Sequence, residues 1–188
     1  MTAIDRLPPG QQWIDRAAVF NVAPVPSVDV ASYRLTIKGS VRTPFVLTLR
    51  EIRALPCMRI SRDIHCVTGW SVKNIVWEGV RTRDLVDRTS PDPGVRWVFV
   101  RGLDGYTTNV PIEEFGRPDC LLAYRMDDAP ISPEHGHPLR LVIPSLYGWK
   151  SAKYVTEIEF ITHLRRGYWE ERGYHDRGDP WTEERYRD

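Results

Sequence analysis

The sequence has few cysteines and no close pair of them. Its three cysteines, Cys57, Cys66 and Cys120, lie far apart in a chain of 188 residues. A disulfide framework needs an even number of cysteines, and a zinc knuckle needs ligands a few positions apart, so both are disfavoured. A glycine-rich dinucleotide fingerprint and a P-loop are also absent from the sequence. Enzymes that use nicotinamide nucleotides or nucleoside triphosphates therefore have no support.

The chain also lacks an excess of charge of either sign and any long apolar run. It has 26 basic and 25 acidic residues, for a net charge of +1. Nucleic acids and anionic membrane surfaces are bound through fields of one sign, so neither is an expected partner. No segment approaches the roughly 18 apolar residues of a spanning helix, and residues 1–19 contain neither a signal-peptide run nor a twin-arginine pair. We therefore expect a cytoplasmic protein without a membrane span.

The patterns that are present indicate one domain rich in strands. With 41% hydrophobic residues, a chain of this length can bury one substantial core. Alternating residues over 33–38 predict a half-buried strand, and the apolar run 97–100 predicts a central one. The Asp104-Gly105 turn after that run is typical of a hairpin. Thr48 and Glu51 have the spacing of a capping box and predict a short helix.

The segments near the two ends set the limits of this domain. The proline-rich segment 20–26 is expected to be extended, because its prolines cannot lie in the interior of a helix. Residues 165–188 carry charges interleaved with aromatic residues, and disordered tails are poor in aromatics, so this tail should pack on the domain. We expect an irregular N-terminal arm over 1–18 and a single mixed α+β domain over 19–188 that includes the aromatic tail.

One cysteine stands in the most informative stretch of the sequence, 63–70. Apolar and β-branched residues lead into Cys66, and Thr68-Gly69 break the run just after it. Cys66 should therefore lie where a strand opens into a loop, with its thiol able to point into a cavity. A thiolate is a soft ligand for thiophilic metals, although a lone cysteine is more often a small buried hydrophobe. For Cys57 and Cys120 we expect packing roles.

A second informative stretch contains Arg140 and Lys153. Arg140 begins the apolar strand 141–143, where an unpaired charge is costly, so it needs either an internal carboxylate or a bound anion. The loop 146–153 then supplies a glycine, the Ser151 hydroxyl and two ammonium groups. Arg grips phosphate with two hydrogen bonds, Lys adds a point charge, and loop amides complete such a cradle. Arg140, Ser151 and Lys153 are thus suited to hold one terminal phosphate.

These stretches together resemble the molybdopterin-binding domain of the sulfite oxidase family, in particular its small stand-alone bacterial members. The resemblance rests on the run 63–71, on 76–80 with the helix after it, and on the pattern His-Gly-x-Pro-x-Arg at 135–140. It extends from about Val19 to the C-terminus. It implies molybdopterin as the cofactor and Cys66 as the one protein ligand to molybdenum.

The resemblance also implies roles for residues outside the Cys66 loop. Contacts to the pterin and its phosphate are implied for Asn21, Asp104, His135, Arg140, Ser151, Ala152 and Lys153. Tyr174 follows Trp169 by five residues, as does a family tyrosine that faces the molybdenum, so catalysis is implied for Tyr174 together with Cys66. A neutral phenol can donate a hydrogen bond to a substrate oxygen. From spacing alone, packing of the tail explains Tyr174, and turn formation explains Asn21 and Asp104, equally well.

The implied activity is oxygen-atom transfer to or from a small substrate as molybdenum changes oxidation state. Sulfite-oxidising members surround their substrate with arginines, whereas Phe20 and Ser71 occupy the matching positions here. A dianion would lack partners there, so reduction of an S-oxide such as methionine sulfoxide is the alternative within the family. Because the chain has no haem domain, the resemblance implies a separate redox partner for the electrons.

A zinc protein with a structural or hydrolytic role is the alternative from another class. Its ligands would be Cys66, His65 and either His135 or His137. This hypothesis requires three of these side chains to converge on one point.

Overall fold

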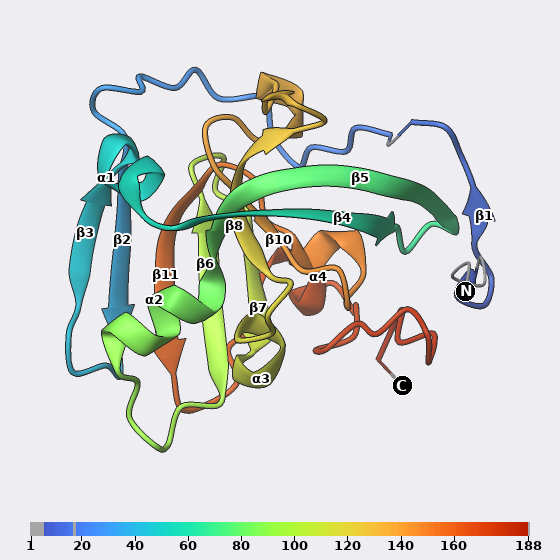
Figure 1. Cartoon of the computed structure of the whole chain (residues 1–188). Helices are drawn as coiled ribbons and strands as arrows, with labels where there is room; N and C mark the ends of the chain where they lie inside the picture. The colour runs from blue at the N-terminus through green and yellow to red at the C-terminus, as the bar shows by residue number, and fades with distance from the viewer. Residues whose placement is uncertain (1–5, 17, 188) are drawn as a thin grey trace.

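A computed structural model of the chain describes residues 6–16 and 18–187. Two β-sheets form its framework, and both appear in Figure 1. The first sheet contains β1 (Gln12–Trp13), β4 (Cys57–His65), β5 (Trp70–Arg81), β8 (Leu121–Met126), β9 (Ala129–Pro130) and β10 (Arg140–Val142). The second contains β2 (Arg34–Gly39), β3 (Phe45–Thr48), β6 (Trp97–Gly102), β7 (Thr107–Pro111) and β11 (Val155–Ile161).

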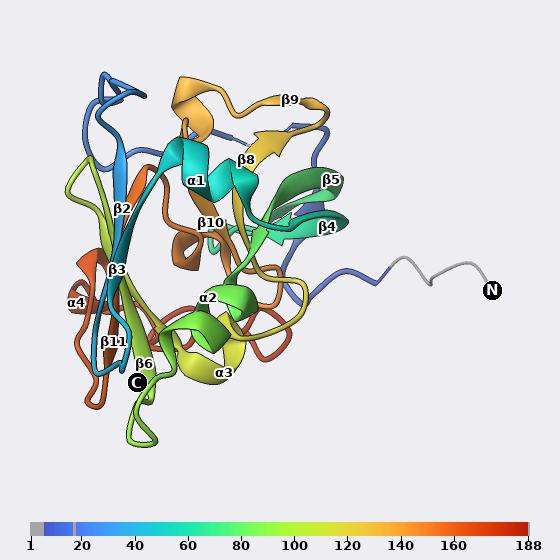
Figure 2. The same cartoon turned by 60° about the vertical axis from the view of Figure 1, so that its left-hand side comes forward.

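Both sheets are mixed, because each contains one parallel pair of strands among antiparallel pairs. The first sheet runs β1-β5-β8-β10, with β4 beside β5 and β9 beside β8, and the second runs β3-β2-β11-β6-β7. The pairs β1–β5 and β2–β11 are parallel, and the others are antiparallel. Figure 2 shows the two sheets as separate layers, with β2, β3 and β11 on its left and β4, β5 and β8 on its right. The expected single, strand-rich α+β domain is confirmed.

Helices are short and join the strands. They are α1 (Leu49–Ala54), α2 (Thr82–Thr89), α3 (Ile112–Phe115) and α4 (Tyr168–Glu171), with 3-10 turns η1 (Pro133–His135) and η2 (Gly148–Lys150). The capping box of α1 is confirmed, because the Glu51 N–H donates to Thr48 Oγ1 at 3.2 Å and the Thr48 N–H donates to Glu51 Oε2 at 2.8 Å. Within the described residues, no helix is long and apolar enough to cross a bilayer.

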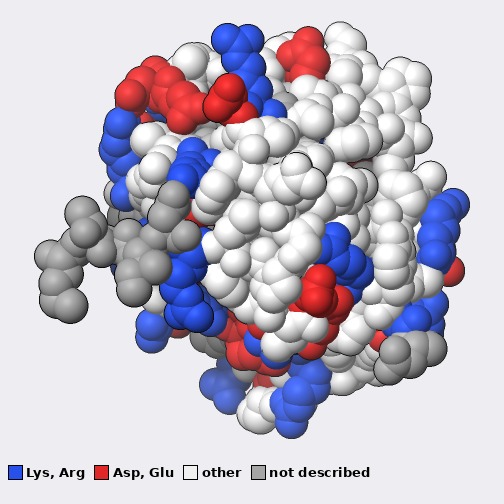
Figure 3. Space-filling model, turned by 90° about the vertical axis from the view of Figure 1, so that its right-hand side faces the viewer, with Lys and Arg blue, Asp and Glu red and all other residues white. Residues whose placement is uncertain are grey.

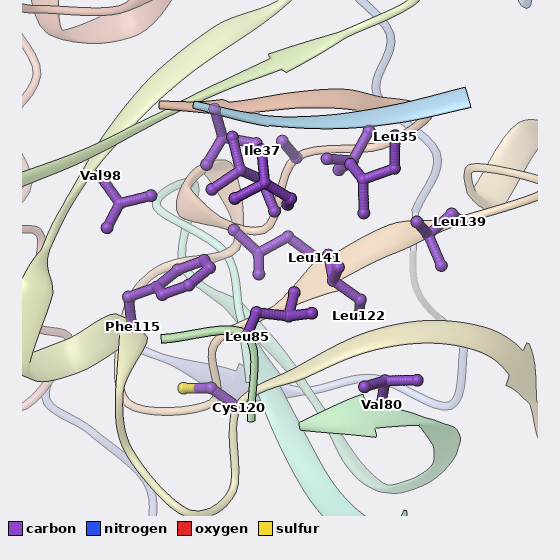
Figure 4. Close-up of a cluster of buried hydrophobic side chains, with 14 of the residues drawn as sticks. Leu35, Ile37, Val80, Leu85, Val98, Phe115, Cys120, Leu122, Leu139 and Leu141 are labelled. Carbon is purple, nitrogen blue, oxygen red and sulfur yellow. The ribbon is translucent and has the colours of Figure 1, made fainter. Parts of the chain in front are cut away.

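The main core lies between the two sheets. Alternate residues of β2, among them Leu35 and Ile37, face Leu122 of β8 and Leu141 of β10 (Figure 4). Each such side chain stabilises the fold by about 1.5–3 kcal/mol when it leaves water. Cys120 is fully buried in this cluster, so the packing role expected for it is confirmed.

Two further expectations at the sequence level differ from the structure. Cys57 is exposed at the start of β4, because its position on a strand faces solvent instead of the core. In the N-terminal arm, Gln12 and Trp13 form β1 and pair with Trp70 and Ser71 of β5. Two residues carry no periodic signal, so this strand could not be predicted. Residues 1–5 and 17 of the expected arm lie outside the described residues.

The β4–β5 hairpin is the feature that positions the site. Its strands are 9 and 12 residues long, and its tip is the loop 66–69. Figure 1 shows the hairpin reaching away from the second sheet toward β1 and the red C-terminal segment. The face of the molecule in Figure 3 carries acidic and basic groups in mixture, as the balanced charge of the sequence predicts.

Candidate functional site

A cavity of about 490 Å³ lies beside the hairpin tip and is lined by segments from both halves of the chain. This volume is within the range of sites that bind small molecules and cofactors. Every residue that the sequence assigns to the molybdopterin site lines it: Asn21, Cys66, Asp104, His135, Arg140, Ser151, Ala152, Lys153 and Tyr174. Residues that are more than 150 positions apart in sequence are thus brought to one cavity.

Cys66 directly follows β4, as expected for a strand that opens into a loop. The loop is closed by its own backbone, because the Cys66 N–H donates to the Trp70 carbonyl at 2.8 Å and the Gly69 N–H donates to the Cys66 carbonyl at 3.1 Å. Gly69 has φ +97°, which favours glycine at this turn. The Cys66 Sγ lies 3.1 Å from Thr68 Oγ1. The thiol is therefore partly exposed at the cavity wall, with a hydroxyl beside it.

Arg140 is a buried cation whose hydrogen-bond partners are neutral. Its guanidinium donates to the carbonyls of His135 at 3.0 Å and Ser151 at 3.3 Å and lies over the Trp77 ring. No described carboxylate pairs with it, and its Nε has no partner within the described structure. Burial lowers the pKa of Arg140 to about 10. Of the two partners that the sequence left open, the bound anion is the one this geometry supports.

Lys153 adds a second cation to the same end of the cavity. Its Nζ donates to the Phe20 carbonyl at 2.9 Å, to Asn21 Oδ1 at 2.6 Å and to the Glu134 carbonyl at 2.8 Å. All three acceptors are neutral. Burial, and next the charge of Arg140, lowers the pKa of Lys153 to about 8. Both cations would be stabilised by an anion between them.

The remaining polar residues at this end are held by short-range contacts. Asp104 Oδ1 accepts from the Tyr106 N–H at 3.1 Å, so Asp104 forms the hairpin turn and lines the cavity at once. Burial raises the pKa of Asp104. Ser151 Oγ accepts from the Ile143 N–H at 3.0 Å, which leaves its own O–H to donate to a ligand. Burial, followed by the charges of Arg140 and Lys153, lowers the pKa of His135.

Tyr174 belongs to an aromatic wall beside Cys66. It stacks on Trp169 with ring centroids 4.9 Å apart and meets Trp149 edge-on at 5.0 Å. Burial, followed by Tyr186 and Cys66, raises the pKa of Tyr174, so the phenol is neutral. Its hydroxyl makes no hydrogen bond to another described residue and is available to a ligand. Tyr174 therefore packs the tail onto the domain and also lines the cavity.

Sequence reasoning missed two residues of this wall. Trp149 lines the cavity, and Tyr106 donates its O–H to the Trp149 carbonyl at 2.6 Å. The available signal was the Tyr-Gly-Trp-Lys run at 147–150 within the loop already assigned to phosphate. Aromatic residues supply large contact areas and often line clefts, which makes this run the signal for Trp149.

A buried ion pair supports the wall from behind. Lys150 Nζ lies 2.6 Å from Glu170 Oε1, and both side chains are fully buried. The same Glu170 oxygen accepts from Trp149 Nε1 at 3.1 Å and from Thr108 Oγ1 at 2.7 Å. Lys150, one of the two ammonium groups that the loop was expected to offer to phosphate, thus points into the protein. It joins η2 to α4, which carries Tyr168 and Trp169.

The residues that match the sulfite-binding arginines lie in different surroundings. Phe20 lines the cavity and is 62% exposed. Ser71 is fully buried, and its Oγ donates to Gln11 Oε1 at 3.0 Å. Ser71 therefore does not line the cavity, because its side chain is turned toward the N-terminal segment.

The zinc hypothesis fails on geometry. His65 Nδ1 lies 2.8 Å from Ser71 Oγ in a buried contact. Across the described residues, no three His, Cys, Asp or Glu side chains gather at a point that would hold a metal ion. The expected zinc ligands, Cys66, His65 and either His135 or His137, therefore do not converge on one point.

The family described as oxidoreductase molybdopterin binding domain matches residues 22–169 of the sequence. The chain belongs to this family. The family resemblance of the Cys66 and Arg140 stretches is confirmed. This protein is therefore an oxidoreductase with Mo-molybdopterin as its cofactor.

Three similar proteins illustrate the range of this molybdopterin-binding family. The uncharacterized oxidoreductase YuiH of Bacillus subtilis is 40% identical over 182 residues, which cover 96% of this chain and 92% of YuiH. The putative protein-methionine-sulfoxide reductase subunit YedZ1 of Azospira oryzae is 31% identical, and the match covers 80% of this chain and 57% of YedZ1. The sulfane dehydrogenase SoxCD of Paracoccus pantotrophus has the same fold, with a TM-score of 0.68 at 23% identity over 74% of this chain and 40% of the SoxCD chain.

The side chains around the cavity fit the molybdopterin cofactor. Arg140 offers an unpartnered, buried Nε and a charge that no described carboxylate neutralises, which suits a terminal phosphate. Cys66 offers a thiol, the ligand type that molybdenum shares with other thiophilic metals. Both line one cavity, so a single ligand with a phosphate and a metal can reach both.

Proposed function

We propose that this chain catalyses oxygen-atom transfer, with reduction of a neutral S-oxide as its favoured direction. The observation that carries the proposal is one cavity with the Cys66 thiol and the Tyr174 phenol beside each other and two cations in its wall that form no salt bridge with a described carboxylate. When bound, the cofactor supplies the two-electron chemistry of the transfer. Cys66 would hold the molybdenum, and Arg140, Ser151 and Lys153 would hold the phosphate. Asn21, Asp104, His135 and Ala152 would line the pterin.

The aromatic wall next to Cys66 has its own part in the reaction. Trp149 and Trp169 exclude water and present flat apolar surfaces to a substrate. Tyr174 would donate its O–H to the substrate oxygen and stabilise the charge that develops there. Since burial raises the pKa of Tyr174, the phenol keeps its proton at neutral pH.

The charge distribution of the cavity favours a neutral substrate over sulfite. Among the described lining residues, Arg140 and Lys153 are the Lys and Arg side chains, and both are assigned to the phosphate. The residues that line the cavity around Cys66 are uncharged: Val67, Thr68, Trp70, Trp149, Trp169 and Tyr174. A desolvated dianion would have no counter-charge there, whereas an S-oxide needs only a hydrogen-bond donor. The name of YedZ1, a methionine-sulfoxide reductase subunit, agrees with this substrate class.

A panel of substrates tests the proposal. With an artificial electron donor, the holoenzyme is expected to reduce small S-oxides with a kcat/KM at least about tenfold above that for sulfite oxidation with an artificial acceptor. N-oxides of matched size are the comparison that separates sulfur selectivity from general oxide reduction. Faster turnover of sulfite than of any oxide would reject the assigned direction.

Replacing Tyr174 by phenylalanine tests the role of the phenol. Phe keeps the ring that stacks on Trp169 and removes only the donor, so kcat should fall by about a hundredfold while molybdenum and pterin content stay at wild-type levels. Tyr33→Phe is the matched control, because the Tyr33 hydroxyl donates to the Val155 carbonyl in the core. Parallel loss of molybdenum and activity in Tyr174→Phe would assign the residue to packing alone.

The electrons for S-oxide reduction would come from a separate redox partner. The match to YedZ1 supports this, since its name describes it as a subunit. The cytoplasmic location expected from the sequence stays a prediction.

A further inference from the structure

Side chains from both ends of the chain hold the backbone of the Cys66 loop. Gln11 Nε2 donates to the Cys66 carbonyl at 3.0 Å across 55 positions of sequence. The Arg185 guanidinium donates to the Val67 carbonyl across 118 positions. Consecutive carbonyls of a four-residue loop are thus each bonded to a segment outside the hairpin. Figure 1 shows β1 and the red C-terminal segment beside the hairpin tip.

The Gln11 amide has only one orientation that satisfies its neighbours. Ser71 Oγ donates its single proton to Gln11 Oε1 at 3.0 Å, so the proton between His65 and Ser71 must be on His65 Nδ1. Gln11, Ser71 and His65 are all buried. With Oε1 committed to Ser71, Gln11 Nε2 faces the Cys66 carbonyl, whereas a rotated amide would place Oε1 against that carbonyl, which has no proton to donate.

Backbone pairing fixes Gln11 in place. The Gln12 N–H donates to the Gly69 carbonyl at 2.8 Å, and the Ile14 N–H donates to the Ser71 carbonyl at 2.9 Å. These bonds form the parallel β1–β5 pair. The segment that was expected to be an irregular arm therefore contains β1, and the pairing of β1 with β5 holds Gln11 in position.

Arg185 connects the tail to the same segment. Its Nη2 donates to the carbonyls of Pro9 at 3.4 Å and Gly10 at 3.3 Å, and its guanidinium lies over the Tyr147 ring. Gly10 has φ +65°, and a Cβ there would lie 2.8 Å from Arg185 Nη2. The arm, the tail and the Cys66 loop meet at this one guanidinium.

We propose that Gln11 and Arg185 are positioning residues that set the direction of the Cys66 thiol. A rotation of the peptides at Cys66 and Val67 would swing the thiol away from the cavity, and the two side chains oppose that rotation by holding both carbonyls. The inference rests on the proposed role of Cys66 as the molybdenum ligand. A misplacement of the ligand by about 1 Å is enough to change turnover strongly.

The test uses the cofactor-loaded enzyme with Gln11→Met, Gln11→Glu and Arg185→Met. Gln11→Met removes both bonds of the amide, and Gln11→Glu keeps the acceptor for Ser71 but removes the donor to Cys66. All three variants should retain pterin, because the phosphate anchors lie elsewhere. Their molybdenum absorption and EPR spectra should shift, and kcat should fall by about tenfold or more with KM nearly unchanged.

Thr82→Val is the matched control for a lost buried hydrogen bond. The Thr82 hydroxyl donates to the Phe115 and Cys120 carbonyls, away from the loop, so this variant should lose stability and keep the wild-type spectra. A lower melting temperature alone in the Gln11 and Arg185 variants, with wild-type spectra and kcat, would overturn the inference. If Gln11→Met does not fold, Arg185→Met decides, since Arg185 is partly exposed.

Cys66→Ser measured in parallel separates this inference from the proposed function. Unchanged molybdenum spectra in Cys66→Ser would refute the ligand assignment itself. Altered spectra in Cys66→Ser with wild-type spectra in all Gln11 and Arg185 variants would refute the positioning role alone.

Discussion

Replacing Cys66 by serine is expected to abolish oxygen-atom transfer while the purified protein retains its pterin. A serine hydroxyl is a hard and weakly acidic group, whereas the thiolate is a soft ligand suited to a thiophilic metal. Loss of an outer-shell partner of a metal ligand already costs about 10- to 100-fold in activity, so loss of the ligand should cost at least about a hundredfold. The pterin stays because Arg140, Ser151 and Lys153 do not depend on the thiol.

The experiment separates the two ends of the cavity. Pterin is measured by its fluorescence after denaturation, molybdenum by elemental analysis, and turnover with an S-oxide. Cys57→Ser is the matched control, because Cys57 is an exposed thiol at the opposite end of β4, and all three quantities should stay at wild-type levels. Full activity in Cys66→Ser would be incompatible with the ligand assignment.

The parts of the site that the sequence predicts are those with strong local patterns. A strand that runs into Thr68-Gly69 places Cys66 at a loop, and a charge at the head of an apolar strand marks Arg140 as a group in need of a partner. The Thr48 and Glu51 spacing predicts the start of α1 for the same reason, since a capping box is complete within four residues. The loop 146–153 adds Ser151 and Lys153, and the family resemblance then adds Asn21, Asp104, His135, Ala152 and Tyr174. All of these residues line the same cavity as Cys66 and Arg140.

The parts that the sequence does not predict depend on partners far along the chain. Ser71 turns away from the cavity because Gln11, 60 positions earlier, supplies its acceptor. Lys150 points inward because Glu170 is buried opposite it. Neither pairing leaves a periodic trace, and a charged residue in a polar loop is ordinarily exposed. Side-chain direction at such positions is set by tertiary contacts.

Lys150→Met is expected to destabilise the fold by about 3–5 kcal/mol, because it leaves the Glu170 carboxylate buried without a counter-charge. For a domain of this size the melting temperature should fall by roughly 6–20 °C. Lys150 Nζ also donates to Asn109 Oδ1 at 2.9 Å and to the Asp176 carbonyl at 2.7 Å, so several acceptors lose a donor together. Glu170 Oε2 already has no hydrogen-bond partner among the described residues.

The double variant Lys150→Met/Glu170→Gln shows whether charge or shape is responsible. A neutral glutamine can still accept from Trp149 Nε1 and Thr108 Oγ1, the other donors to Glu170, so more than half of the lost stability should return. Arg81→Met is the control, since the Arg81–Asp84 pair lies at the surface and should contribute less than about 1 kcal/mol. Calorimetric melting of the wild type, Lys150→Met, the double variant and Arg81→Met tests the prediction. A double variant as unstable as Lys150→Met would show that an unpaired charge is not the cause.

The same ion pair should also affect turnover, because Glu170 anchors α4 and the Trp149 indole. At temperatures below its melting range, Lys150→Met should turn over more slowly than the wild type. The double variant should recover turnover in step with stability.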